Sequence, residues 1–157
     1  MRLADDLVET AQNLVSGSAA GRPRHANLRR AVSTAYYAVF HALAHHCAER
    51  LVGTSPDRSD AAWTQAYRAL DHGPTKETFK QLSNLGFPAD LQYFGRNFQD
   101  LQEERNRADY DPIARFSRGE AAILVQRARE AIAYLDNAPR RDQTALAVLV
   151  TMKERRP

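Results

Sequence analysis

The stretch LQYFGRNFQDLQEERNRADY, residues 91–110, decides the fold of this chain. Its apolar residues repeat at alternating spacings of three and four, which places them along one face of a helix. They are Leu91, Phe94, Phe98 and Leu101. Proline readily opens a helix and does not continue one, so Pro88 and Pro112 mark the expected start and end of this segment. We therefore predict a long amphipathic helix that buries one face in a core.

The same helical period recurs on both sides of this stretch. His72-Gly73-Pro74 is expected to stop one short helix before the next begins. Ser117 and Glu120 have the spacing of a capping box, which predicts the start of a further helix, and Pro139 closes that helix. Besides the central segment, the expected helices span residues 3–15, 23–51, 61–71, 76–82 and 117–135.

These segments predict an all-α fold. Period-two strand patterns and internal repeats are absent from the sequence, so an antiparallel bundle of four to five main helices is the natural architecture. We expect one helical domain over residues 1–137 and a C-terminal extension over residues 138–157. The apolar run Ala145–Met152 in that extension is short and rich in β-branched residues. A helix and a strand added to a partner both remain open for it.

The composition is typical of one globular domain. A chain of 157 residues with 43% hydrophobic residues can bury a normal core without cross-links. Cys47 is the only cysteine, so an internal disulfide is excluded. The N-terminal residues 1–15 are acidic and amphipathic, unlike a signal peptide, and no apolar run approaches membrane-spanning length. We therefore expect a cytoplasmic protein without a membrane partner.

The charge is mildly basic. A net charge of +3 and a pI near 9.2 suit contact with phosphate groups, although many proteins without such a partner share this excess. Of the 22 basic residues only Lys76, Lys80 and Lys153 are lysines. Arginine offers a planar fork that grips phosphate or carboxylate at two points, but a GC-rich genome would produce the same bias. Both explanations stay open.

Arg105 is the unexpected residue of the central helix. Continuing the apolar stripe by the same spacing leads to Arg105 and then to Ala108, so a cation occupies a position where an apolar residue is expected. A buried guanidinium without a partner is strongly unfavourable. Arg105 must therefore meet a carboxylate, emerge into a cleft or face a second subunit. Asp109, four residues on, can reach it along the same face.

A file of polar side chains runs along the long helix expected at residues 23–51. Ser33, Tyr37 and His41 lie four residues apart, which places them on one face, with Arg30 near the start of the file. Such a file has two uses. It can satisfy buried charges on a neighbouring helix, or it can line a site.

Two motifs resemble a known family. Ala35-Tyr36-Tyr37-Ala38-Val39-Phe40-His41 lies on the first long helix and Arg105-Asn106-Arg107-Ala108-Asp109-Tyr110-Asp111 on the central one, with His72-Gly73 between them. In this order they are similar to the small stand-alone branch of the prokaryotic HEPN proteins. The resemblance covers roughly residues 1–136. Either motif alone would be a weak signal, and the two together are fairly specific.

The resemblance implies a bundle of four or five helices that forms a homodimer and acts on or beside RNA. HEPN proteins include metal-independent endoribonucleases, often toxins of toxin–antitoxin or defence systems paired with a nucleotidyltransferase antitoxin, and RNA-binding accessory modules. In the nucleases an arginine, a polar residue and a histidine five positions after the arginine cleave RNA. By this comparison the candidate catalytic residues are Arg105, Asn106 and Tyr110, and the supporting residues are Asp109, Arg107, Ser33, Tyr37 and His41.

Tyr110 occupies the position of the expected histidine. A tyrosine with an ordinary pKa of about 10 is a poor base at neutral pH. Tyr110 can still donate to a phosphate oxygen while Arg105 or Arg107 stabilises transition-state charge, or His41 can supply the proton. A non-catalytic module that dimerises and recruits a nucleotidyltransferase or other partner is the alternative. Adenylylation of Tyr110 by such a partner is a third interpretation.

No cofactor or metal is expected. His41, His45 and His46 have helical zinc-ligand spacing, but the Glu of the His-Glu-x-x-His motif is missing. Gly-rich phosphate loops, Cys-x-x-Cys pairs and Gly-x-Ser-x-Gly elbows are absent from the sequence.

Overall fold

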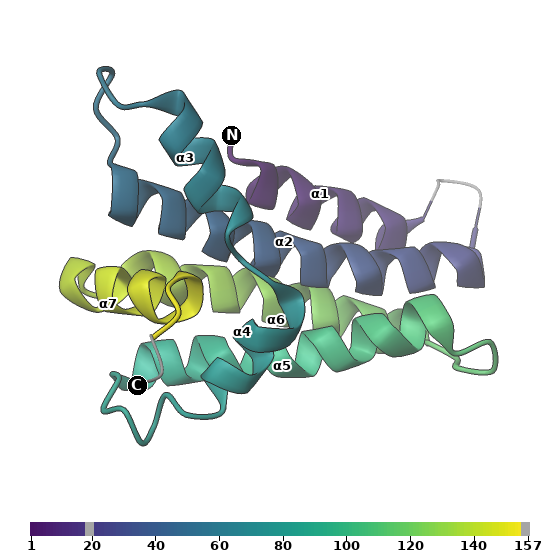
Figure 1. The fold of residues 1–157 in the computed structure, drawn as a ribbon. Coiled ribbons are helices and arrows are strands. Elements are labelled where there is room, and N and C mark those ends of the chain that lie inside the picture. Colours follow the sequence, from purple (N-terminus) through teal and green to yellow (C-terminus); the bar gives the residue numbers. More distant parts are fainter. Residues whose placement is uncertain (18–20, 155–157) are drawn as a thin grey trace. The chain divides into compact units, whose positions relative to one another are not determined.

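The computed structural model describes residues 1–17 and 21–154 (Figure 1). Over these residues the chain forms seven α-helices and no strand, which confirms the all-α class. None of these helices is long and apolar enough to cross a membrane. The helices are α1 (Leu3–Ser16), α2 (His25–Val52), α3 (Asp60–Arg68), α4 (His72–Phe79), α5 (Ala89–Tyr110), α6 (Arg118–Asn137) and α7 (Arg140–Thr151).

The C-terminal extension is helical, because α7 covers the run for which a helix and a strand were both open. Residues 155–157, at the end of that extension, lie outside the described residues.

The predicted start signals act as expected at α5 and α6. Pro88 precedes α5, and its carbonyl oxygen accepts the backbone N–H of Leu91 at 3.1 Å. At the start of α6, the Ser117 N–H donates to Glu120 Oε2 (2.9 Å) and the Glu120 N–H donates to Ser117 Oγ (3.0 Å), which is a complete capping box. The predicted stripe of α5 is fully buried, at 0% exposure for Leu91, Phe94, Phe98 and Leu101.

Helix α4 begins earlier than the sequence pattern predicted. His72-Gly73-Pro74 was expected to separate two helices, yet it forms the first turn of α4, and the expected helix at 76–82 was placed wrongly. The first turn of a helix has N–H groups without intrahelical partners, so a proline there removes no bond. The first backbone N–H of α4 to donate to a carbonyl oxygen four residues earlier is that of Thr75, which donates to Asp71 at 3.2 Å.

The chain divides into two compact units, and helices α2, α5 and α6 contribute residues to both. Unit 1 comprises residues 1–42 and 96–133. In it Arg127 of α6 donates to Asn97 Oδ1 of α5 at 3.0 Å, and α1 and α6 together line a cavity of about 370 Å³. The fully buried apolar residues of unit 1 include Val32, Val39, Phe98, Leu101 and Val125.

Unit 2 comprises residues 43–95 and 134–157, of which the structure describes those up to 154. Its α7 lies against α4, and the Gln143 side-chain amide of α7 donates to the Leu135 carbonyl oxygen of α6 at 2.8 Å. His46 Nε2 of α2 and Asp136 Oδ1 of α6 are 2.8 Å apart. The largest fully buried side chains of this unit include Leu43, Leu82, Leu91, Phe94, Leu135 and Leu146.

Candidate functional site

The two motifs that carry the family resemblance contact each other in unit 1. Arg105 of α5 is buried, at 8% exposure, and its guanidinium carbon lies 5.0 Å from the ring centroid of Tyr36 and 5.6 Å from that of Tyr37, both on α2. A guanidinium over an aromatic face gains about 0.5–2 kcal/mol, more when it is desolvated. The unexpected cation on the apolar stripe therefore meets aromatic rings.

Tyr36 also hydrogen-bonds with the Arg105 side chain. Burial raises the pKa of the Tyr36 phenol to about 12, and the Arg105 charge and hydrogen bond act in the opposite direction. Tyr36 is therefore a neutral phenol at physiological pH. It can hold the guanidinium in place, but it cannot serve as a base near pH 7.

Asp109, the carboxylate that could reach Arg105 along the same helix, is not its partner. Among the described residues Arg105 forms no ion pair, and its Nε is buried without a hydrogen-bond partner. The Asp109 Oδ2 atom instead accepts a hydrogen bond from Ser33 Oγ of α2 at 3.2 Å. The predicted polar file thus contacts α5 at two points, Ser33 with Asp109 and Tyr37 with Arg105.

His41, the last member of that file, packs its ring edge-on against Phe40, with ring centroids 5.7 Å apart. Burial lowers the pKa of the His41 imidazole below its ordinary value. The neutral imidazole is therefore favoured near pH 7.

The predicted catalytic residues separate onto different faces of α5. Residues five apart on a helix differ in direction by about 140°, and residues four apart by about 40°. Arg105 accordingly points into the core while Asn106 and Tyr110 point into solvent, with Tyr110 74% exposed. Exposed Arg107 forms an ion pair with Glu104 at 2.7 Å. The structure does not gather Arg105, Asn106 and Tyr110 around one point.

Arg29 is a residue of this region that the sequence pattern did not single out. Its guanidinium donates to the carbonyl oxygens of Ala108 (2.7 Å) and Ala114 (2.9 Å), and to that of Asp111. The last carbonyls of a helix have no intrahelical donor. Many helices end in a glycine that lets the following N–H groups bond the last carbonyls. Asp111-Pro112 follows α5 instead, and this is the one sequence signal that the carbonyls at its end need a donor from another segment.

Two histidines of α2 each face a single carboxylate. No group of three or more His, Cys, Asp or Glu side chains that could hold a metal ion occurs within residues 1–17 and 21–154. His45 pairs with Glu49 at 2.9 Å and His46 with Asp136 at 2.8 Å.

No protein-family model matches the chain, and no curated protein or solved structure is significantly similar to it.

Proposed function

We propose that this chain is an HEPN-type, RNA-associated binding module in which the contact between α2 and α5 has a structural role. The observation that carries this proposal is the inward direction of Arg105. Its guanidinium packs on two tyrosine rings of α2, in a position that is 8% exposed. An arginine enclosed in this way stabilises the helix pair and offers little of its charge to a substrate.

The surroundings of Arg105 argue against standard cleavage. A general base must lie within hydrogen-bond reach of the proton that it takes, and its pKa should lie near the working pH. The Tyr36 hydroxyl group, which hydrogen-bonds with Arg105, has a pKa of about 12. Tyr110 takes the position of the family's histidine, and it points away from Arg105 into solvent.

Binding and cleavage can be measured on the same sample. The purified chain is titrated into a short single-stranded RNA with a fluorescent label, with EDTA present, and the fluorescence anisotropy is followed. The RNA is then run on a denaturing gel. We expect saturable binding that weakens as salt is added, together with intact RNA. Light scattering of the same sample measures the molar mass and so tests the homodimer that the resemblance implies.

A metal-independent ribonuclease toxin is the second candidate. Asn106 and Tyr110 lie four residues apart, so they share one face of α5, and both are exposed to solvent. Cleavage by the wild-type chain, lost in a folded Arg105→Met variant, would establish this function and contradict the binding module. Growth arrest on expression, relieved by the same variant, would support it further. Absence of any binding by the wild-type chain would contradict RNA association itself.

A further inference from the structure

Two segments that carry arginine and no carboxylate meet at one end of unit 1. Residues 10–48 and residues 112–119 contain no Asp or Glu. His25 Nε2, in the first turn of α2, accepts the backbone N–H of Phe116 at 3.1 Å, and Arg29 donates to the Ala114 carbonyl oxygen at 2.9 Å. These bonds hold the start of α2 against the turn between α5 and α6, at the same end of the unit in Figure 1.

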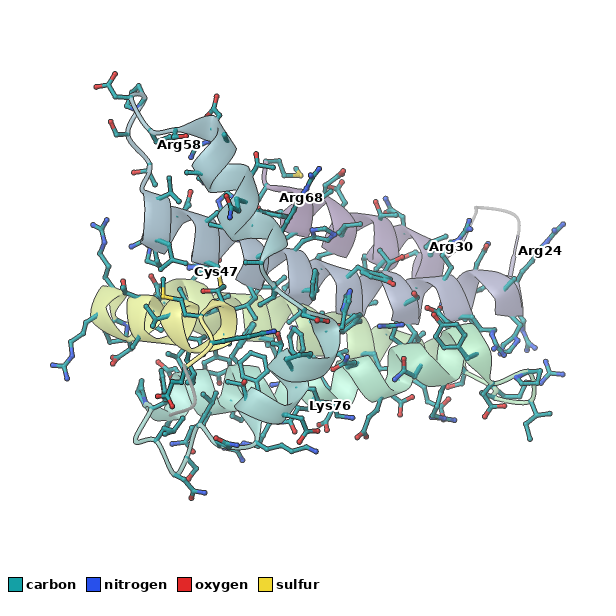
Figure 2. All side chains as sticks on the ribbon, in the orientation of Figure 1. Arg24, Arg30, Cys47, Arg58, Arg68 and Lys76 are labelled. Atoms are coloured by element: carbon teal, nitrogen blue, oxygen red, sulfur yellow. The ribbon has the colours of Figure 1, made fainter. Side chains whose placement is uncertain are left out.

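The exposed side chains of these segments form what we call the arginine surface. Arg118 donates to the Ser16 carbonyl oxygen at 3.2 Å, while the other arginines of the surface form no ion pair with any residue that the structure describes. Figure 2 shows Arg24, directly before α2, and Arg30, in the first part of α2, extending outward. The arginine surface consists of Arg22, Arg24, Arg30, Arg115 and Arg118, all exposed.

Two carboxylates at this end of unit 1 accept hydrogen bonds from neutral donors and form no ion pair with a described residue. Asp109 accepts from Ser33 at 3.2 Å, and Asp111 Oδ1 accepts the backbone N–H of Ile113 at 3.0 Å. None of the five guanidinium groups of the arginine surface forms an ion pair with a described residue. A surface of this kind attracts polyanions.

Large apolar side chains are exposed at the end of α5 and in the turn that carries Arg115. Tyr110, the last residue of α5, is 74% exposed, and Ile113 in the following turn is 84% exposed. A solvated tyrosine ring at the end of unit 1 that carries unpaired arginines suits a single-stranded nucleic acid, since each base has a face that can stack on the ring.

A cavity opens at the same turn. It measures about 270 Å³, and its walls include Arg115, Arg107 and the ring of Phe116. Of its two carboxylates, Glu104 pairs with Arg107 of the same cavity at 2.7 Å, and Glu120 accepts the Ser117 N–H at 2.9 Å. The Phe116 ring is 5% exposed and lies 5.3 Å from the Arg107 guanidinium carbon. The cavity therefore offers a ligand the unpaired guanidinium of Arg115, which can bind a phosphate in a fork.

We propose that the arginine surface binds single-stranded RNA, with guanidinium groups on the phosphates and Tyr110 stacked on a base. This inference rests on the proposed RNA association and assigns its location. Guanidinium groups bind phosphate oxygens in a fork and also stack on bases. In double-stranded RNA the bases are already stacked on one another, so none of them presents a face on which the Tyr110 ring can stack.

The test compares two variants with the same change in charge. The surface variant carries Arg22→Gln, Arg24→Gln, Arg30→Gln and Arg115→Gln. The control variant carries Arg68→Gln, Arg129→Gln, Arg140→Gln and Arg141→Gln, which are exposed arginines outside the arginine surface. None of the arginines replaced in either variant forms an ion pair with a described residue, so both variants should fold. Circular dichroism checks this, and the double variant Arg24→Gln, Arg115→Gln replaces the surface variant if it is unfolded.

Affinity for the labelled RNA is measured over a range of salt concentrations. Each phosphate contact contributes about 0.7 to the slope of log affinity against log salt for a single strand, so the surface variant should lose up to about 3 from that slope. We expect its affinity to fall by about tenfold or more at low salt. The control variant should stay close to wild type. Tyr110→Ala should lower the affinity for RNA, whereas Tyr110→Phe, which keeps the ring, should bind RNA with an affinity close to that of the wild-type chain.

The possible failures are distinguishable. If the wild-type chain binds RNA and the two charge variants are weakened equally, binding follows net charge and the arginine surface is wrong, while RNA association stands. The same conclusion follows if neither variant is weakened. If the wild-type chain binds no RNA, both proposals fail. Equal affinity for duplex RNA, or binding to anionic phospholipid vesicles in place of RNA, overturns single-stranded RNA as the ligand.

Discussion

The guanidinium of Arg29 in α2 donates to the carbonyl oxygen of Ala108 in α5, at 2.7 Å and across 79 residues of sequence. The same guanidinium reaches the carbonyl oxygens of Asp111 and Ala114 in the turn that follows. One side chain thus supplies the donors that the end of α5 lacks. It also ties this helix end, and the turn beyond it, to α2.

Replacing Arg29 should cost substantial stability. A hydrogen bond to a charged group is worth about 1.5–3 kcal/mol, and several share this guanidinium, so we expect Arg29→Ala to lower the free energy of unfolding by about 2–4 kcal/mol. Arg29→Lys should recover only part of this loss, because one ammonium group cannot reach all the carbonyls in the geometry of the planar fork. Urea-induced unfolding followed by circular dichroism measures both variants.

Arg30 provides the control for this prediction. It is the next residue of α2, and it is exposed without an ion pair to a described residue. Arg30→Ala should change the free energy of unfolding by less than about 0.5 kcal/mol. Similar losses for Arg29→Ala and Arg30→Ala would show that the carbonyl contacts contribute nothing specific.

The helical fold could be predicted because its signals are local. The stripe of α5 and the capping box of Ser117 and Glu120 depend on residues three or four apart, and both were found as predicted. The start of α4 was placed wrongly because a proline stops a helix interior yet is tolerated in a first turn. Sequence spacing alone does not say which of these positions Pro74 occupies.

The candidate site was less predictable because its contacts join distant residues. The stripe showed that Arg105 needed a partner, but the nearest carboxylate on its own helix was the natural candidate. The structure places the rings of Tyr36 and Tyr37 there instead, and Asp109 turns to Ser33. Arg29 gave no local signal, since its partners are backbone carbonyls about 80 residues away.

Arg105 should be replaceable by an apolar side chain of similar length. Its charge has no ion pair among the described residues, so removing it leaves no buried counter-charge behind. We expect Arg105→Met to lower the free energy of unfolding by about 1–2 kcal/mol, because it loses the ring contacts and the hydrogen bond with Tyr36. Arg105→Ala should cost about 3–5 kcal/mol because it also leaves a cavity. Equal losses in the two variants, measured by urea unfolding, would show that the guanidinium itself is required.

His41 should make the fold sensitive to acid. Burial lowers the pKa of His41 in the folded chain, so below about pH 6.5 the unfolded chain binds the proton more readily than the folded one. This contribution to stability is therefore present above about pH 6.5 and declines as the pH falls through the lowered pKa. His41→Gln and His41→Phe should each reduce the slope of stability against pH in this range. An unchanged slope would contradict the prediction.

Cys47 should report on unfolding. Its thiol is fully buried, at 0% exposure, and burial raises its pKa to about 12. Since the thiolate is the reactive form, a disulfide reagent at pH 8 should react slowly with the folded chain and fully in denaturant. The slow reaction requires opening of the fold, so Arg29→Ala should accelerate it. Rapid reaction of the wild-type chain without denaturant would contradict the burial of this thiol.

Gly95 should be required for the close packing of α5 in unit 2. A Cβ atom at this position would lie 3.0 Å from Leu82 Cδ1 and 3.0 Å from Phe79 Cδ1, two side chains that are themselves buried. Alanine gains about 1 kcal/mol of helix propensity over glycine, but overpacking typically costs about 1–3 kcal/mol. We therefore expect Gly95→Ala to be destabilising. Gly119→Ala is the matched control in α6, where the added Cβ meets only Ser117 Oγ at 3.9 Å.

The control variant should be neutral or more stable than wild type, by up to about 1 kcal/mol, because it gains helix propensity without a close contact. Thermal unfolding compares the two glycines directly. Gains of equal size at both positions would mean that Phe79 and Leu82 yield to the new methyl group, and that the packing around Gly95 is looser than its 3.0 Å approaches indicate.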